Sequence, residues 1–278
     1  MPSPVLNEKV MKEASATWAP PASSSDHFPP VRDQPVSDGP VSPWKPPRVM
    51  TVNGAISATA VLFVLFLTTA AIGWIQTDTV EIGEESFVAT IPMLAWVGMF
   101  VGIGLTFLLM FKPHLAKIIG PIYALAQGFF VGAISKAYET SYSGIVVQAA
   151  GATIAVFAVM LVMYRTRIIK VTDRFRRTII TATIGIMVFY GVTFLIRLFA
   201  GADSVSFMNS PSLLGIGFSV FVAGIAAMNL ALDFDFIERG AEQRLDKDFE
   251  WYAAFGLLVT IIWLYLEILR LLSKLRER

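Results

Sequence analysis

The sequence contains no cysteine among its 278 residues, which excludes disulfide bonds, thiol nucleophiles and zinc sites built from thiolates. Histidine is nearly as scarce, and His27 and His114 are too few for a histidine-rich metal centre. Charged residues make up only 15% of the chain, against roughly 25% in typical soluble domains. The net charge of +1 gives no overall field that would attract nucleic acid, so we expect no nucleic-acid partner.

Apolar residues, in contrast, make up 55% of the chain, more than the core of a water-soluble protein of this size can hide. A helix that crosses the bilayer core needs about 20 consecutive apolar residues. No apolar window shows the strict two-residue alternation of a membrane barrel. The sequence therefore predicts an all-α membrane protein with seven transmembrane helices, at residues 54–75, 91–111, 118–137, 144–164, 178–199, 212–233 and 251–272.

The first fifty residues have a different composition. They hold 11 of the 15 prolines, interspersed with serine and aspartate, and bury too little apolar surface to offset the entropy of ordering. No apolar run follows the N-terminus closely, so the segment is not a signal peptide. We expect residues 1–50 to be a disordered cytoplasmic tail and residues 51–278 to be the transmembrane domain. Trp18 and Trp44 leave open a docking role for the tail.

The charged residues between the windows predict an orientation. The first loop carries Asp78, Glu81 and two further glutamates, Glu84 and Glu85, and no basic residue, whereas the fourth loop carries six basic residues between 165 and 177. By the positive-inside rule, the N-terminus lies in the cytoplasm, and seven spans then place the C-terminus outside the plasma membrane. Four basic residues in the last nine favour the opposite side for the C-terminus, and a re-entrant last segment would place it there.

The third predicted helix carries small residues at a spacing of four. Lipid provides little hydrophobic drive between helices, so close backbone approach and hydrogen bonds hold them together. We expect the ridge to serve plain helix packing, with Gln127 able to bond a neighbouring helix; the alternative is a hinge or the close wall of a pore. The ridge residues are Gly120, Ala124, Gly128 and Gly132.

Two aspartates close the sixth window. Asp233 and Asp235 are two residues apart, about 200° around a helix, so they cannot face the same point. We expect one to face the bundle and the other to face water or a loop. Glu250 opens the seventh window, where an acidic residue complements a helix N-terminus, although it also lies at the depth of a functional site.

The seventh window contains two further polar residues. Thr260 lies about 15 Å along the helix from its start, and Glu267 lies close to the far surface. Arg270 is three residues beyond Glu267, and we expect the two to form an ion pair. Because ionisable groups inside a membrane are costly, this window and the preceding one supply the candidates for an ion path or proton sensor: Asp233, Asp235, Glu250, Thr260 and Glu267.

The sequence gives little support for an enzymatic function. The sequence has no nucleophile-elbow, zinc-hydrolase or phosphate-loop motif. An intramembrane aspartyl protease needs two aspartates on different helices, and Asp233 and Asp235 share one helix. We therefore expect a protein that is not an enzyme and that holds no cofactor beyond a transient Ca²⁺.

Four segments resemble the Bax inhibitor-1/YccA-like family, also called the transmembrane Bax-inhibitor-motif family, in its bacterial branch. They are the run from Leu232 to Glu238, the two stretches 250–258 and 264–272, and the small-residue helix at 123–135. The resemblance covers about residues 48–278 and leaves the proline-rich tail outside. It implies seven helices, with the last one central and wrapped by the other six.

The same resemblance implies a function. Family members are described as pH-sensitive calcium leak channels, eukaryotic relatives as suppressors of cell death, and some bacterial members associate with membrane proteases. In the calcium-leaking members, one aspartate on the sixth helix and one on the seventh form a proton-sensing pair. Asp233 matches the first, whereas Thr260 occupies the position of the second, and the second helix has no arginine to bind Asp233.

Two functions follow as hypotheses. The first is a cation leak, of calcium or protons, with Asp233 as the main carboxylate and Asp235 and Glu250 as an acidic mouth. The second is a non-conducting regulator that binds membrane proteins, such as a membrane protease, through its small-residue faces and its tail. The lipid bilayer is the partner that both hypotheses share, and the sequence does not predict the oligomeric state.

Overall fold

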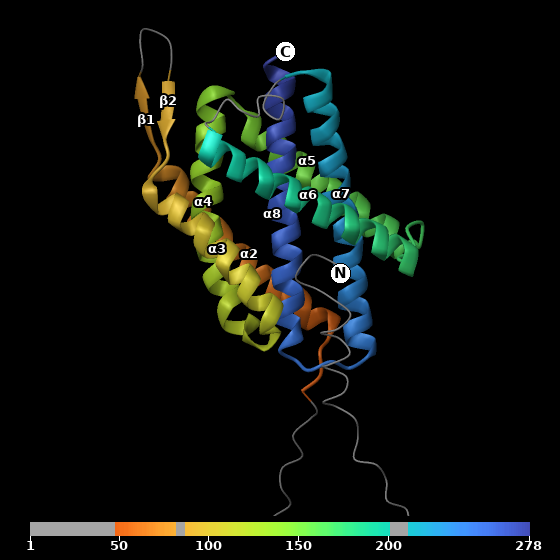
Figure 1. The fold of residues 1–278 in the computed structure, drawn as a ribbon. Coiled ribbons are helices and arrows are strands. Elements are labelled where there is room, and N and C mark those ends of the chain that lie inside the picture. The colour runs from red at the N-terminus through yellow and green to blue at the C-terminus, as the bar shows by residue number, and fades with distance from the viewer. Residues whose placement is uncertain (1–47, 82–86, 201–210) are drawn as a thin grey trace, which may run out of the picture.

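The computed structural model describes residues 48–81, 87–200 and 211–278, which form a bundle of long helices (Figure 1). The predicted tail up to residue 47, and Glu84 and Glu85 of the acidic first loop, lie outside the described residues. Seven of the described helices are long and apolar enough to cross a membrane, which confirms the predicted number. They are α2 (Val52–Ile75), α3 (Met93–Phe111), α4 (Ala116–Ser141), α5 (Ile145–Arg165), α6 (Asp173–Ala200), α7 (Leu213–Glu242) and α8 (Phe249–Arg276).

Most helix boundaries lie close to the predicted ones, and α7 differs most. It continues to Glu242 rather than ending at Asp233, so both aspartates lie within the helix instead of at its end. Hydrophobicity falls at Asp233, but the backbone hydrogen bonds continue, because the polar residues that follow find partners on other helices. A short 3₁₀ turn, η1 (Pro113–Leu115), joins α3 to α4.

One small β-hairpin adds to the helices. Strands β1 (Asp78–Glu81) and β2 (Phe87–Thr90) pair antiparallel, with Asp78 opposite Thr90 and Thr79 opposite Ala89. The hairpin extends from the bundle between α2 and α3 (Figure 1). Apart from the turns that connect the helices, the described residues are therefore helical except in this hairpin and an isolated bridge.

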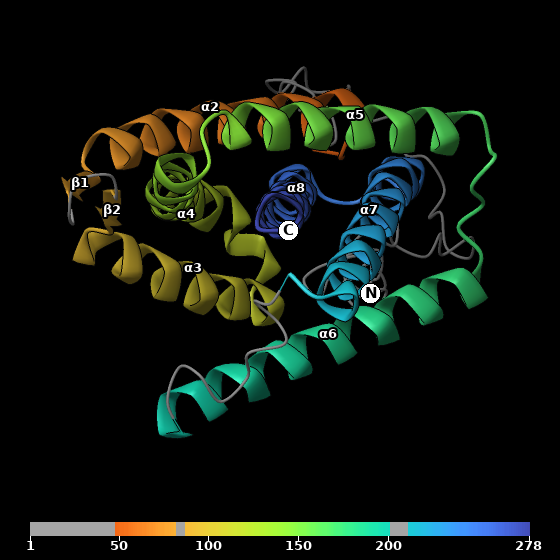
Figure 2. The same cartoon turned by 90° about the horizontal axis from the view of Figure 1, so that it is seen from above.

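Helix α8 occupies the centre of the bundle, as the resemblance implies (Figure 2). Helices α2, α4, α5 and α7 pack directly on it, while α3 packs mainly on α4 and α6 mainly on α7. The helix runs without a break from one end of the bundle to the other, which is the course of a crossing helix and not of a re-entrant one (Figure 1). Its central position explains why so many of its side chains are buried, among them Tyr252, Phe255 and Leu258.

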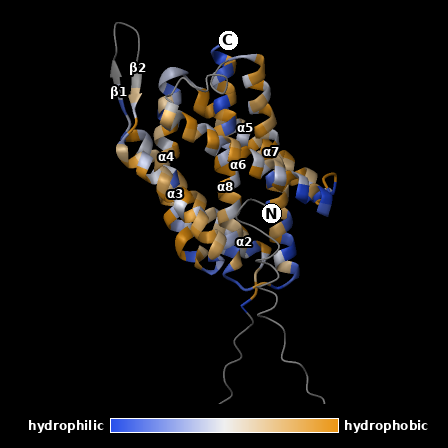
Figure 3. Cartoon of the chain, viewed as in Figure 1, coloured by the Kyte–Doolittle hydropathy of each residue, from blue (hydrophilic) through white to orange (hydrophobic). Residues whose placement is uncertain are grey.

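Polarity is distributed along the bundle as a membrane requires. Apolar residues cover the middle of the helices, and hydrophilic residues gather at the helix ends and connections (Figure 3). Many large apolar side chains on the outer helices are exposed, including Met93 at 82%, Phe111 at 80% and Phe199 at 85%. Such a surface is stable when lipid covers it.

The segment just before α2 is ordered against the α7–α8 connection. The Met50 amide donates to the carbonyl of Leu245 at 2.7 Å, and the Lys247 amide donates to the carbonyl of Arg48 at 3.0 Å. Val49 forms an isolated antiparallel bridge with Asp246. These bonds attach residues 48–50, which precede α2, to the connection between α7 and α8.

The small-residue ridge of α4 lies against α2. A Cβ atom on Gly128 would lie 2.3 Å from the carbonyl oxygen of Phe66, and one on Gly132 would lie 1.9 Å from that of Ala70. Gly120 is less crowded, because its nearest neighbours are methyl groups of Leu62 at 3.5 Å. The two helices thus approach backbone to backbone at the later ridge positions, where any side chain would separate them.

The other two residues singled out on α4 are also buried. Ala124 is completely buried, and Gln127 is 7% exposed. The Gln127 amide nitrogen reaches across to the carbonyl of Met99 on α3 at 3.5 Å, at the long limit for a hydrogen bond. Gly102 on α3 makes room for this side chain, because a Cβ there would lie 1.8 Å from the same nitrogen.

Candidate functional site

Asp233 lies on α7 in the interior of the bundle. Its side chain is completely buried, and neither carboxylate oxygen has a hydrogen-bond partner among the described residues. The Thr260 side chain of α8 adjoins the carboxyl group, but its hydroxyl donates to the carbonyl of Gly256 at 3.1 Å. Asp233 therefore faces the bundle, as one of the two aspartates was expected to do, and among the buried carboxyl groups of the described residues it is the one with both oxygens unpartnered.

A second polar side chain lies one helical turn before Asp233. Asn229 is 1% exposed and donates to the Thr183 hydroxyl of α6 at 2.8 Å and to the carbonyl of Ile225 at 2.9 Å. Its amide oxygen has no partner. Asn229 was not among the predicted site residues, although its spacing of four from Asp233 within an apolar helix was a signal that could have found it.

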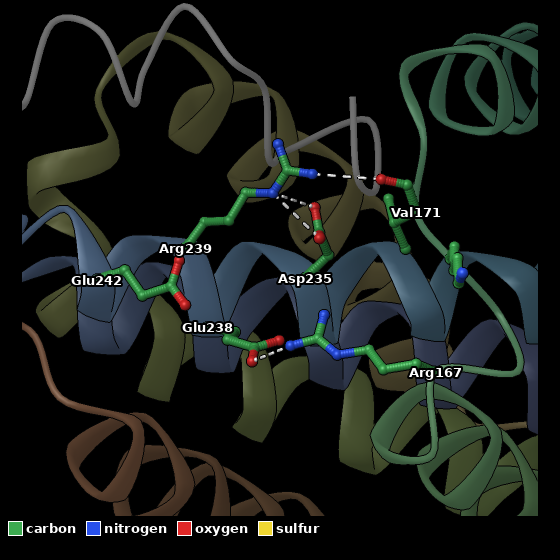
Figure 4. Close-up of a pocket in the computed structure, with 7 residues that line it drawn as sticks. Arg167, Val171, Asp235, Glu238, Arg239 and Glu242 are labelled. Atoms are coloured by element: carbon green, nitrogen blue, oxygen red, sulfur yellow. Dashed lines mark hydrogen bonds and ion pairs between the residues drawn. The ribbon is translucent and has the colours of Figure 1, made fainter.

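Asp235 lies on the other side of α7, toward α6. Arg176 of α6 pairs with its carboxylate at 2.8 Å, and Arg239, one turn later on α7, pairs with it at 3.0 Å. Arg239 also donates to the carbonyl of Val171 at 3.3 Å (Figure 4). Asp235 thus faces the α5–α6 connection, as expected of the second aspartate, but two arginines shield it from water and its side chain is only 8% exposed.

The pocket in Figure 4 lies at this charged end of α7 and has a volume of about 420 Å³. Glu238 lines it and pairs with Arg167 at 2.8 Å, while the Tyr164 hydroxyl also donates to Glu238. Arg167 is 62% exposed, so this pair is far more open to solvent than the Asp235 pairs. Three basic and three acidic side chains line the pocket, so their formal charges balance.

Glu250 lies in the first turn of α8 and is 5% exposed. Its carboxylate accepts hydrogen bonds from the backbone amide and from the hydroxyl of Thr51, each at 3.0 Å. Thr51 is the N-cap of α2, so Glu250 places negative charge at the N-termini of two helices at once. Glu250 is therefore a helix-end charge. Its contact with the N-terminus of α2 was not predictable from the local sequence.

Glu267 lies near the C-terminal end of α8 and is 1% exposed. The predicted pair with Arg270 is confirmed, with a distance of 2.9 Å. Tyr190 of α6 joins the pair, since it donates to Glu267 at 2.8 Å and accepts from Arg270 at 2.8 Å. The second carboxylate oxygen of Glu267 is buried without a partner.

The five predicted site residues therefore do not form one cluster. Asp233 of α7 and Thr260 of α8 lie side by side in the interior of the bundle. Asp235, Glu250 and Glu267 belong to three separate contacts. Sequence reasoning missed their partners on other helices, namely Arg176, Thr51 and Tyr190, because no local pattern relates residues so far apart in the chain. Arg239 was readable, because it follows Asp235 by one helical turn.

The family model described as Bax inhibitor 1 like matches residues 3–277, and the chain therefore belongs to this family. The match also corrects the expected limit of the resemblance, because it extends over the proline-rich tail. No curated protein matches the chain.

Proposed function

We propose that the protein is a cation leak of the cell membrane, passing calcium or protons, in which Asp233 is the carboxylate that responds to pH. The observation that carries this proposal is the complete burial of Asp233 without a hydrogen-bond partner for either oxygen. An unpaired carboxylate inside a membrane protein is costly unless positive charge reaches it. A proton and a passing cation both supply that charge, which links occupancy of the site to pH.

The other carboxylates are less suited to this role. Asp235 is held by two arginines, and Glu250 is held by Thr51. We therefore place the ion path at Asp233 and Thr260, with Ca²⁺ as a transient passenger rather than a bound cofactor. A leak needs only weak and brief binding, so a single carboxylate is sufficient for it. The proposal includes no catalytic reaction.

The alternative hypothesis, a non-conducting regulator, relies partly on small-residue faces that bind other membrane proteins. The principal face of this kind is covered by α2 in the same chain, so Gly128 and Gly132 are not available to a partner. This packing favours the leak over a regulator that uses the ridge.

Calcium uptake into proteoliposomes across a pH series tests the proposal. We expect a pH-dependent leak in the wild type, and Asp233→Asn should hold the flux at one pH-independent level because the residue no longer exchanges a proton. Thr260→Asp should steepen the pH response, because two adjacent carboxyl groups titrate as a coupled pair. Glu242→Gln, an exposed change on the same helix, is the control and should behave as the wild type.

Two outcomes would contradict the proposal in different ways. Equal flux in wild type, Asp233→Asn and empty vesicles would refute the leak and favour the regulator. A wild-type leak whose pH response survives Asp233→Asn would retain the channel but remove the sensor from Asp233.

We also propose that the α2 N-terminal end of the bundle faces the cytoplasm. Two of the six basic residues between 165 and 177, Arg167 and Arg176, pair with Glu238 and Asp235 in the last turns of α7. The α7–α8 connection that follows these turns is bonded to the segment before α2. The hairpin and the C-terminus lie at the opposite end of the bundle (Figure 1). This arrangement is the one that the positive-inside rule favours.

A further inference from the structure

An apolar groove of about 770 Å³ lies on the side of the bundle formed by α2 and α5. The two helices run along the same side of the molecule, with α4 and α8 behind them (Figure 2). Side chains of α2 and of the first half of α5 form the walls, and side chains of α4 and α8 form most of the floor. Small residues such as Ala60, Ala70 and Ala150 leave this space unfilled.

The groove reaches from the outer surface into the interior. At its rim, Ile154 is 68% exposed and Ile56 is 59% exposed. On its floor, Val131 is 3%, Leu257 is 6% and Ile262 is 5% exposed. An apolar molecule in the groove would therefore contact residues that lipid at the outer surface of the protein does not reach.

The hydroxyl groups that line the groove already have hydrogen-bond partners. The Thr59 hydroxyl donates to the carbonyl of Ala55 at 2.8 Å, and the Thr153 hydroxyl donates to that of Ala149 at 2.7 Å. The hydroxyls of Ser135 and Tyr265 bond each other at 2.7 Å. No lining hydroxyl needs a polar ligand, so the body of the groove favours a hydrocarbon chain.

One end of the groove carries a positive charge. Trp74 lines the groove near the end of α2, and the ammonium of Lys136 lies 5.2 Å from the centre of its ring. Lys136 directly follows Ser135 of the lining, and no described carboxylate pairs with it. Tryptophan and lysine are the side chains that membrane proteins place at the level of the lipid headgroups.

We propose that this groove binds a phospholipid from the bilayer, with an acyl chain along the apolar floor and its phosphate at Lys136. A phospholipid unites the two features of the site, a long apolar body and an anionic group at one end. The bilayer that covers the exposed apolar helices presents such molecules directly to the opening between α2 and α5. The site is separate from Asp233, so its test does not depend on the proposed leak.

Photolabelling of the full chain in vesicles tests the site. The vesicles contain phosphatidylcholine with a small share of phosphatidylglycerol that carries a diazirine in one acyl chain, and mass spectrometry maps the adducts. We expect adducts on the floor residues Val131, Leu257 and Ile262, in addition to exposed residues of α3 such as Met93 and Phe111. The α3 adducts report general lipid contact and show that each variant is inserted and folded.

Two pairs of variants separate the groove from general lipid contact. Ala150→Phe fills the groove and should lower the floor adducts about tenfold, because a large ring in an occupied site excludes the chain. Ala155→Phe is the same change at an exposed position of α5 outside the lining and should leave them unchanged. Lys136→Gln should lower floor labelling, whereas Lys117→Gln, at the other end of α4, should not.

Three results would overturn the proposal. The first is labelling of α3 without labelling of the floor in the wild type. The second is floor labelling that Ala150→Phe and Lys136→Gln both leave unchanged. The third is an unlabelled floor in a chain that cross-links to a second copy through α2 or α5, which would assign the groove to a protein partner.

Discussion

At the scale of single residues, the partner of each buried carboxylate decides its role. Asp235 pairs with two arginines, Glu250 accepts hydrogen bonds from the N-cap of another helix, and Glu267 pairs with an arginine and accepts from a tyrosine. Asp233 alone among these four has no partner for either oxygen in the described structure. Three of these groups are therefore held by contacts with other residues, and the fourth is the carboxylate on which the proposed leak rests.

Asp235→Ala should destabilise the protein strongly. The change removes the carboxylate that pairs with Arg176, whose side chain is 11% exposed, and the loss of one member of a buried pair costs about 3 kcal/mol or more. Glu238→Gln is the matched control, because its partner Arg167 is 62% exposed and exposed pairs contribute less than about 1 kcal/mol. Unfolding in detergent measures both, and equal losses would contradict the distinction between the two pairs.

Glu250→Ala should lower stability by about 1 to 3 kcal/mol, because the amide and hydroxyl of Thr51 lose their acceptor. Glu242→Ala, at an exposed position, should have little effect. A double-mutant cycle with Thr51→Val measures the contact itself, and the double variant should lose less than the sum of the single changes. Strict additivity would show that Glu250 does not act through Thr51.

At the scale of elements, the contact between α2 and α4 depends on missing side chains. Glycines on α4 let the two backbones approach, and Gly73 does the same on α2, where a Cβ would lie 2.2 Å from the carbonyl oxygen of Phe129. Close approach of this kind replaces the hydrophobic drive that helices lack in lipid. The pair α2 and α4 is therefore a tightly fitted unit beside the central helix.

Gly132→Ala should lower the melting temperature in detergent, because its Cβ would lie 1.9 Å from the carbonyl oxygen of Ala70. Gly151→Ala on α5 meets nothing within 4 Å and should be neutral or stabilising, since alanine favours a helix by about 1 kcal/mol over glycine. Gly120→Ala should also be tolerated. If Gly132→Ala and Gly151→Ala melt alike, α2 and α4 do not approach as closely as the structure shows.

At the scale of the whole molecule, seven long apolar helices separate the segment before α2 from the C-terminus. The segment before α2 and the C-terminus lie at opposite ends of the bundle, and the hairpin lies at the C-terminal end (Figure 1). Helix α8 runs through the centre of the bundle from one end to the other. It passes Asp233 in the interior. The basic connection between α5 and α6 is the feature on which the proposed orientation rests.

Single cysteines introduced into this cysteine-free chain should report the orientation without background labelling. Thr79→Cys in the hairpin and Arg278→Cys at the C-terminus should react with an impermeant maleimide added to intact cells. Arg174→Cys, next to the start of α6, should react only after the membrane is opened. Outside labelling of position 174 would overturn the orientation, and protection of position 278 alone would move the C-terminus inside.

The sequence by itself determined the helices and their number. Seven apolar windows predict seven crossings because the bilayer selects for length and apolarity, which are local properties. The ridge of α4 and the pair of Glu267 with Arg270 were also readable, since residues three or four apart on a helix are neighbours. The extension of α7 to Glu242 was not, because its charged last turns depend on partners elsewhere.

Only the tertiary structure decided which buried groups are paired. Arg176 is 59 residues from Asp235, and Thr51 is 199 residues from Glu250, so nothing in the local pattern links them. The groove between α2 and α5 is likewise a property of packing, formed where small side chains of different helices face one another. Local sequence sets how each helix meets the membrane, whereas the meeting of distant helices determines which charges and cavities remain open for function.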